Sequence, residues 1–360
     1  MDGLEKAILC TIHSIPGLGN RSLWKIMDEF GSFKKFFEAD RKTLYASFLK
    51  PDIIDNLLEK RKSSPEILME EYRSLDIEIV TWDESLYPHN LRNISNPPVV
   101  LYYRGDIELA GHICLAMVGS RAASVYGRNV ARKLARELAE SGIVIVSGLA
   151  RGIDSEAHQG ALETGKTIAV LGSALNIIYP PENRKLVEEI IAGGAVISEF
   201  PLHTHPEPSN FPLRNRIISG LCRGVIVVEG KEKSGALITA DFALEQGRDV
   251  FAVPGPINSK TSAGPNNLIK QGAKLITGIE DILEEYYDIN RTPGTLRQDR
   301  LLLLDDNEKL VLEQLAHESL HFDELIQTCG LPIGTLSTIL FKLEFEGIIK
   351  SLPGNYYVKI

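Results

Sequence analysis

The chain has 360 residues, of which 44% are hydrophobic and 24% are charged, and its formal net charge is −9. This length suits two or three domains, and the composition is typical of a globular protein. No apolar run is long enough to span a bilayer. The first residues show no basic patch before an apolar stretch, so neither a membrane span nor a secretory signal is expected.

The charge is unevenly distributed along the chain. Residues 1–100 carry 13 Lys and Arg against 16 Asp and Glu, residues 101–300 carry 22 against 23, and residues 301–360 carry 4 against 9. The whole molecule does not attract nucleic acid, so any DNA site must be a local basic groove in the central segment. The cysteines are far apart in apolar stretches, which indicates reduced thiols and a cytoplasmic location.

The first predicted segment, residues 1–80, is helical and polar. Residues 12–26 have the form of a helix-hairpin-helix turn, in which Gly17 and Gly19 permit a tight bend. Backbone N–H groups in such a bend can meet a phosphate. Because the flanks are acidic, we favour a small helical bundle without a DNA contact over a DNA-binding hairpin.

The second predicted segment, residues 81–288, alternates apolar strands with amphipathic helices, which is the pattern of a parallel α/β sheet. Right-handed crossovers place every strand-to-helix turn at one edge of the sheet, where such folds bind ligands. We expect strands over residues 113–118, 143–147, 167–171, 195–198, 224–229, 250–253 and 274–276, and helices over 127–140, 154–163, 183–192, 212–221, 235–246 and 265–271.

A linker is predicted over residues 289–306, followed by a winged-helix domain over residues 307–360. The helix expected over residues 333–346 would be the DNA-recognition helix, but Lys342 is its only basic residue. Since an acidic helix does not neutralise phosphates, we favour a packing or protein-interaction role for this domain. The predicted fold is α/β: an extended Rossmann-like parallel sheet core with a helical N-terminal domain and a C-terminal winged helix.

Glycine turns follow the first two predicted strands of the sheet, and each opens a helix. A glycine lets the backbone approach a ligand, and the N-terminal end of a helix favours an anion. Arginine adds a planar fork that suits phosphate oxygens, and Asp154 is expected to cap the second helix. Two such turns side by side would hold consecutive phosphates. The candidate phosphate-binding residues in them are Gly119, Ser120, Arg121, Gly148, Arg151 and Gly152.

A third candidate segment begins at Phe211, which can stack on a base, and Pro212, which suits the first turn of a helix. Arg214 and Arg216 flank Asn215 near the start of that helix, the end expected to face the glycine turns. The alternative for the two arginines is an ion pair with carboxylates. We favour binding, because the arginines accompany an aromatic residue at a helix start.

Several other kinds of site are not expected. There is no GxGxxG motif and no acidic residue at the end of the second strand, so no dinucleotide cofactor is predicted. Residues 160–167 match the Walker A pattern, but a predicted helix precedes them and a strand follows, the reverse of a P-loop. His203 and His205 lack companion ligands at metal spacing. No nucleophile and base stand at a suitable spacing, so no catalytic residue is predicted.

Seven stretches of the central segment form a specific set in their order, although each glycine turn alone is a weak signal. They are Val118-Gly119-Ser120-Arg121, Ser147-Gly148-Leu149-Ala150-Arg151-Gly152-Ile153-Asp154, Tyr179-Pro180-Pro181-Glu182-Asn183, Ser198-Glu199-Phe200-Pro201, Phe211-Pro212-Leu213-Arg214-Asn215-Arg216, Ser234-Gly235-Ala236-Leu237-Ile238-Thr239-Ala240 and Val253-Pro254-Gly255. Together they resemble the DNA processing protein A family.

That resemblance implies an extended Rossmann fold that binds single-stranded DNA without cleaving it and needs no cofactor. It also implies a homodimer that acts in natural transformation, protects incoming single strands and loads the RecA recombinase onto them. Arg121 would be a main phosphate ligand, with Gly119, Ser120, Gly148 and Gly152 in the cradle and Arg214 and Arg216 at its rim.

Two alternatives stay open. One is a nucleoside monophosphate hydrolase of the lysine-decarboxylase-like family, whose Rossmann core is similar. Members of that family share a Pro-Gly-Gly-x-Gly-Thr stretch followed by a catalytic Glu, and residues 229–236 depart from it here. The other alternative is a protein scaffold with no affinity for nucleic acid.

Overall fold

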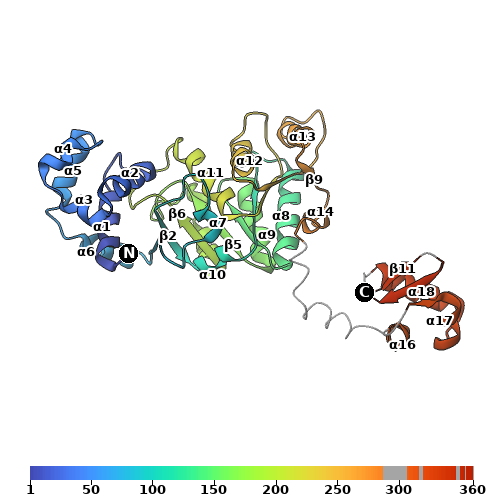
Figure 1. Cartoon of the computed structure of the whole chain (residues 1–360). Helices are drawn as coiled ribbons and strands as arrows, with labels where there is room; N and C mark the ends of the chain where they lie inside the picture. The colour runs from blue at the N-terminus through green and yellow to red at the C-terminus, as the bar shows by residue number, and fades with distance from the viewer. Residues whose placement is uncertain (287–305, 316–318, 346–348, 353, 360) are drawn as a thin grey trace. The chain divides into compact units, whose positions relative to one another are not determined.

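The structure is a computed structural model that describes residues 1–286, 306–315, 319–345, 349–352 and 354–359. The chain divides into two compact units, Met1–Glu285 and Tyr286–Ile360 (Figure 1). The N-terminal helices and the large sheet fall in the same unit, and a domain boundary near residue 80 stays a prediction. The linker predicted over residues 289–306 lies, except for Asp306, outside the described residues.

A nine-stranded sheet forms the centre of the first unit. Its strands are β1 (Glu78–Thr81), β2 (Val100–Gly105), β3 (Cys114–Val118), β4 (Val144–Ser147), β5 (Thr167–Leu171), β6 (Gly194–Ser198), β7 (Gly224–Val227), β8 (Asp249–Ala252) and β9 (Lys274–Leu275). Their order in space is β1-β2-β6-β5-β4-β3-β7-β8-β9, and β3 to β9 run parallel. The predicted α/β fold with a mostly parallel sheet is therefore confirmed.

Two strands in the sheet were absent from the sequence prediction. β1 pairs antiparallel with β2, and β2 pairs antiparallel with β6, so together they extend the sheet at one end. β2 begins two residues after Pro98, the second of two consecutive prolines that break the regular structure of the chain. A short strand after such a break carries little periodic signal of its own.

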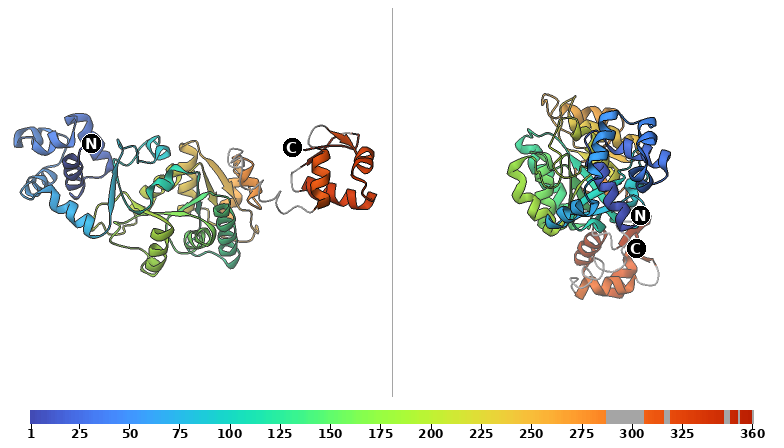
Figure 2. Two further views of the ribbon diagram at one scale, coloured as in Figure 1. Left: turned by 90° about the horizontal axis from the view of Figure 1, so that it is seen from below. Right: turned by 90° about the vertical axis from the view of Figure 1, so that its left-hand side faces the viewer.

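Helices cover both faces of the sheet (Figures 1 and 2). Residues of α7, α11, α12 and α13 share one hydrophobic core with alternate residues of the strands. α8, α9 and α10 cover the opposite face. The bounds are α7 (His89–Arg92), α8 (Val125–Glu140), α9 (Ile153–Thr164), α10 (Arg184–Gly193), α11 (Asn210–Leu221), α12 (Gly235–Glu245), α13 (Ala263–Lys270) and α14 (Glu280–Leu283), with short 3-10 helices at Ile107–Gly111 and Pro181–Asn183.

The N-terminal helices lie at the β1–β2 end of the sheet (blue in Figure 1). They share a second hydrophobic core with β2, β5, β6 and α10. At this junction the ring of Tyr102 in β2 stacks on Tyr72, with centroids 5.0 Å apart, and its hydroxyl lies 3.0 Å from Nδ1 of His13. The helices are α1 (Gly3–His13), α2 (Asn20–Phe30), α3 (Phe33–Glu38), α4 (Arg41–Ala46), α5 (Pro51–Lys60) and α6 (Pro65–Ser74).

The second unit is a small domain with the order helix, strand, helix, helix and two strands. A three-stranded sheet of order β10-β12-β11 packs with three helices around a core that includes Leu325, Leu336 and Leu343. The elements are α16 (Asp306–Gln314), β10 (Leu320–His321), α17 (Phe322–Cys329), α18 (Ile333–Phe345), β11 (Ile349–Leu352) and β12 (Tyr356–Lys359). This is the predicted winged-helix arrangement, with β10 as a further short strand that was not predicted.

In the part of the chain that the structure describes, no single helix is long and apolar enough to cross a membrane. α17 and α18 reach that length and apolarity only as a pair, and they are bent by 114° at the break between them.

Replacing Tyr102 by Ala is expected to lower the free energy of unfolding by about 3–5 kcal/mol, because truncating a buried aromatic leaves a cavity. Tyr102 is fully buried in the second core, where the N-terminal helices meet the sheet. Urea unfolding followed by the fluorescence of Trp24 and Trp82, whose rings lie 5.1 Å apart, measures this change. Tyr45→Ala, at a half-exposed position, is the control and should change stability by less than about 1 kcal/mol. Equal losses in the two variants would contradict this assignment.

Candidate functional site

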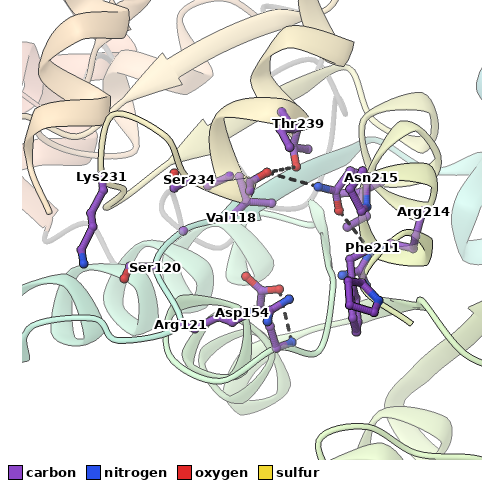
Figure 3. A pocket seen from close by; sticks show the side chains of 18 of the residues that line it. Val118, Ser120, Arg121, Asp154, Phe211, Arg214, Asn215, Lys231, Ser234 and Thr239 are labelled. Carbon is purple, nitrogen blue, oxygen red and sulfur yellow. Dashed lines mark hydrogen bonds between the residues drawn. The ribbon is translucent and has the colours of Figure 1, made fainter. Parts of the chain in front are cut away.

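A cavity opens at the carboxyl ends of the parallel strands, where the direction of the chain path reverses. From β3 the chain continues to β4 on one side, whereas β7, β8 and β9 lie on the other side of β3. Loops that leave such a switch point diverge, and the crevice between them is the usual ligand site of open α/β sheets. The cavity has a volume of about 610 Å³ and is lined by the loop after β3, the start of α9, and the N-terminal parts of α11 and α12 (Figure 3).

The N-terminus of α8 does not hold an external anion, although the sequence analysis expects one there. The carboxylate of Glu229, only 2% exposed, accepts hydrogen bonds from the backbone N–H of Ser124 at 2.8 Å and from its hydroxyl at 2.6 Å. A side chain at Gly127 would clash with this carboxylate. The chain's own carboxylate therefore occupies the positive end of α8.

The glycines of the second turn allow two loops to pack against each other. Gly152 has a left-handed φ of +79°, and a Cβ atom there would collide with the carbonyl oxygen of Ser120. A Cβ atom at Gly148 would lie 2.6 Å from Nη2 of Arg214. Neither glycine lines the cavity. Gly152 also precedes α9 as its N-cap, so Asp154 lies in the first turn of the helix and the prediction of Asp154 as the cap is wrong.

Arg214 is buried at the back of the cavity and held in one position. Its Nη1 donates to the carbonyl oxygens of Gly148, at 2.7 Å, and Val170, and its Nε donates to Oδ1 of Asn215 at 3.2 Å. Asn215 in turn donates from Nδ2 to the carbonyl oxygen of Gly235 at 3.2 Å. Burial lowers the pKa of Arg214 to about 10, so the guanidinium is still a cation at neutral pH.

Aromatic rings stand beside these cations. The Arg121 guanidinium lies 5.0 Å from the centre of the Phe211 ring, and that of Arg214 lies 6.0 Å from it. The ring of Tyr179 is 5.9 Å from Phe211, tilted by 44°, and it is partly exposed. Cations and π faces thus share one surface, as in sites that hold single strands of nucleic acid.

Positive charge dominates the lining of the cavity. Among the described residues, the charged groups that line it are Arg121, Arg214, Lys231 and Lys233, together with the single carboxylate of Asp154. In Figure 3, Lys231 and Ser120 lie at one side, Phe211 and Arg214 lie at the other, and Asp154 lies between them. The pocket is therefore cationic within a protein whose net charge is −9.

α12 contributes a helix N-terminus to the same pocket. Its N-cap Ser234 forms no side-chain capping bond, and its first turn carries no acidic residue. The positive end of this helix therefore faces the cavity without an internal carboxylate, next to Lys231 and Lys233. Residues 234–240 at the start of α12 belong to the seven stretches named above, whereas Lys231 and Lys233 were not predicted. Their place in the loop after β7 was the signal that could have found them.

Of the ten residues predicted to bind phosphate or DNA, the structure brings six together around the cavity and leaves four outside it. Arg151 pairs instead with Glu182 on the surface. The residues that line the cavity are Gly119, Ser120, Arg121, Phe211, Arg214 and Asn215, and those that do not are Gly148, Arg151, Gly152 and Arg216.

Arg216 is buried in an ion pair with Glu199, so the ion-pair alternative describes it better than a place at the rim. Both side chains are less than one-tenth exposed. Burial raises the pKa of Glu199, and Arg216 opposes part of that rise. Arg214 and Arg216 are two residues apart on a helix, and side chains at that spacing do not share a face.

Arg216→Ala is expected to lower the free energy of unfolding by about 3–5 kcal/mol, because it leaves the buried carboxylate of Glu199 without its partner. Arg104→Ala, which breaks a more exposed ion pair with Glu188, should cost less than about 1 kcal/mol. Thermal unfolding of both variants measures the difference. A wild-type melting temperature for Arg216→Ala would contradict a stabilising role of the buried pair.

Comparison with known proteins agrees with this architecture. Residues 78–287 match the family model of DNA recombination-mediator protein A, and residues 298–355 match the DprA winged helix domain. The chain belongs to the DNA recombination-mediator protein A family. It is 42% identical to Protein Smf of Escherichia coli over 287 residues, which cover 77% of this chain and 76% of that protein. It is also 42% identical to DNA processing protein DprA of Bacillus subtilis over 251 residues, covering 69% and 84%.

Two solved structures of the DprA family resemble this one. DprA from Streptococcus pneumoniae superimposes with a TM-score of 0.66 at 37% identity, covering 79% of this chain and 98% of that chain. DNA processing protein A from Helicobacter pylori superimposes with a TM-score of 0.54 at 32% identity, covering 59% and 96%. The resemblance found in the sequence motifs is therefore confirmed.

Proposed function

We propose that this member of the family binds single-stranded DNA in the cavity at the β3–β7 switch point. The observation that carries the proposal is the convergence there, in an acidic protein, of four cations and two aromatic rings against one carboxylate among the residues that the structure describes. The cations and the free N-terminus of α12 would neutralise backbone phosphates. Arg121 is exposed and makes no ion pair among the described residues, so it is the principal ligand in this proposal.

A single strand fits this pocket better than a duplex. Phe211 and Tyr179 present π faces on which unpaired bases can stack, and such stacking tolerates every base. Bases in a duplex are already stacked on one another and not available to these rings. In support, the H. pylori relative is described as having a single-stranded DNA binding mode, and the similarity covers 96% of that chain.

The family membership supports a wider role as a recombination mediator. In this proposal the protein acts as a cytoplasmic homodimer during natural transformation, protects incoming single strands and loads the RecA recombinase onto them. It needs no cofactor and catalyses no reaction. Dissociation of the dimer, or loss of RecA binding, can be measured independently of DNA binding.

The alternative function, a nucleoside monophosphate hydrolase, would require a catalytic group at the same edge of the sheet. A hydrolase needs a carboxylate able to activate water, whereas the carboxylate of Glu229 is held by Ser124 and by the hydroxyl of Thr261 at 3.1 Å. We expect no release of base or phosphate from nucleoside monophosphates by the full-length protein, followed by chromatography. Turnover that disappears on Glu229→Gln would support the alternative.

Arg121→Ala is expected to weaken binding of a fluorescent oligodeoxythymidylate by about tenfold to a hundredfold, because hydrogen bonds to charged groups contribute about 1.5–3 kcal/mol. The loss should be similar for other base sequences, since phosphates carry no sequence information. The slope of log affinity against log salt should also become shallower by about 0.7 for the one lost phosphate contact. Fluorescence anisotropy at several salt concentrations measures both effects.

Arg136→Ala is the matched control, because Arg136 is exposed on α8, does not line the cavity and carries the same charge. It should leave affinity and salt slope close to wild type. An equal loss in both variants, or a loss confined to one base sequence, would contradict the proposal.

A further inference from the structure

We propose that Asp154 sets the affinity of the pocket by taking up one proton from solvent when a DNA phosphate enters, after which the neutral acid donates a hydrogen bond to that phosphate. This inference rests on the proposed binding of DNA in the cavity. In this proposal Asp154, the one acidic residue among the described residues of the lining, takes part in recognising the phosphate.

The carboxyl group of Asp154 lies in the pocket and, among the described residues, forms no ion pair with a cation. Asp154 is 6% exposed, lies in the first turn of α9 and lines the cavity. One oxygen accepts a long hydrogen bond, 3.3 Å, from the backbone N–H of Ala150. Among the described residues, none forms an ion pair with Asp154, even though Arg214 and Arg121 are near enough to act on it electrostatically.

The surroundings of Asp154 bring the pKa of its carboxyl group close to neutral pH. Burial raises the pKa of Asp154 to about 6, although Arg214, the N–H groups of Ala150 and Gly148, and Arg121 all act to lower it. A carboxyl group with this pKa is mostly ionised at pH 7, yet protonating it costs little.

Other charged or titratable groups around Asp154 cannot take its place as the proton acceptor. The charged groups that share the lining with Asp154 are Arg214 on α11, Arg121 after β3, and Lys231 and Lys233 across the cavity, and all four are basic side chains. His158 lies one turn further along α9, but burial and Arg214 lower its pKa to about 3. His158 therefore stays neutral between pH 6 and pH 8. Among the described residues, Asp154 is the carboxyl group that lines the cavity.

A phosphate that enters the pocket favours the protonated form of Asp154. It competes for the same two guanidinium groups and repels the carboxylate, and both effects raise the pKa of Asp154 above its value in the free protein. The proton comes from solvent and forms the O–H bond, no other covalent bond changes, and the new hydroxyl donates to a phosphate oxygen. Because the bound state holds the extra proton, affinity should rise as pH falls toward about 6 and level off below it.

Proton uptake can be measured on the wild-type protein alone. Oligodeoxythymidylate is titrated into the full-length chain at pH 7 by calorimetry, in two buffers of different ionisation enthalpy. The difference in heat gives the number of protons taken up, and we expect a value approaching one. Over the same range, the dissociation constant should weaken by about tenfold from pH 7 to pH 8, the limit for linkage to one proton.

The variant Asp154→Asn tests whether Asp154 is the residue that takes up the proton. Asparagine keeps an oxygen acceptor for the N–H of Ala150 and presents a neutral donor to the pocket. The variant should bind without proton uptake, with a dissociation constant that is constant from pH 6 to pH 8 and about tenfold or more tighter than wild type at pH 8. Asp241→Asn, at an exposed position on α12 outside the lining, makes the same change in net charge and should behave as wild type.

Three results would overturn the inference: wild type that binds without proton uptake, Asp154→Asn that retains the pH dependence, or Asp154→Asn that binds more weakly than wild type at pH 8. Each of them leaves the proposed function standing, because the wild-type protein still binds the oligonucleotide. Failure of the proposed function has a different signature, namely no binding by wild type at any pH.

Discussion

The pocket depends on the contacts of one buried cation, the guanidinium of Arg214. It reaches from α11 to the carbonyl oxygens of Gly148 and Val170, at the ends of β4 and β5. These bonds fix α11 against the sheet and so hold Phe211 beside Arg121. Nη1 donates to carbonyl oxygens and Nε to Oδ1 of Asn215, and neither partner neutralises the charge of Arg214. Asp154 acts on this cation electrostatically, but among the described residues no ion pair with Arg214 forms, so the buried cation can still attract a phosphate.

The helix N-termini of this fold differ in their ligands from those of dinucleotide-binding proteins. In those proteins a phosphate binds at the N-terminus of the helix that follows the first parallel strand. Glu229 occupies that position at α8, and Asp154 lies in the first turn of α9. α12 turns its positive end toward the cavity and has no acidic residue in its first turn, and the same holds for α11. Side-chain cations, among them Arg121 of the first glycine turn, therefore supply the attraction for a phosphate together with α12, whereas the N-termini of α8 and α9 do not.

Much of the sheet could be predicted from the sequence, because buried parallel strands are continuous apolar runs between glycine turns. The topology rule then places those turns at one edge, which brings Arg121 and Phe211 together across 90 residues of sequence. The direction in which each side chain of α11 points could not be predicted. The first residue of a helix is predicted only to within a residue or two, and an error of that size turns each side chain to another face. Arg214 and Arg216 therefore looked equivalent, whereas one faces the pocket and the other pairs with Glu199.

The central claim is that the switch-point cavity, and not the hairpin turn or the winged helix, holds single-stranded DNA. Hydrogen exchange of the full-length chain, with and without an excess of oligodeoxythymidylate, tests it directly because backbone amides report each region separately. The account predicts slower exchange over residues 119–123 and 231–236, with residues 14–21 and 333–345 unchanged. Protection confined to the hairpin or the winged helix, with none around the cavity, would contradict it.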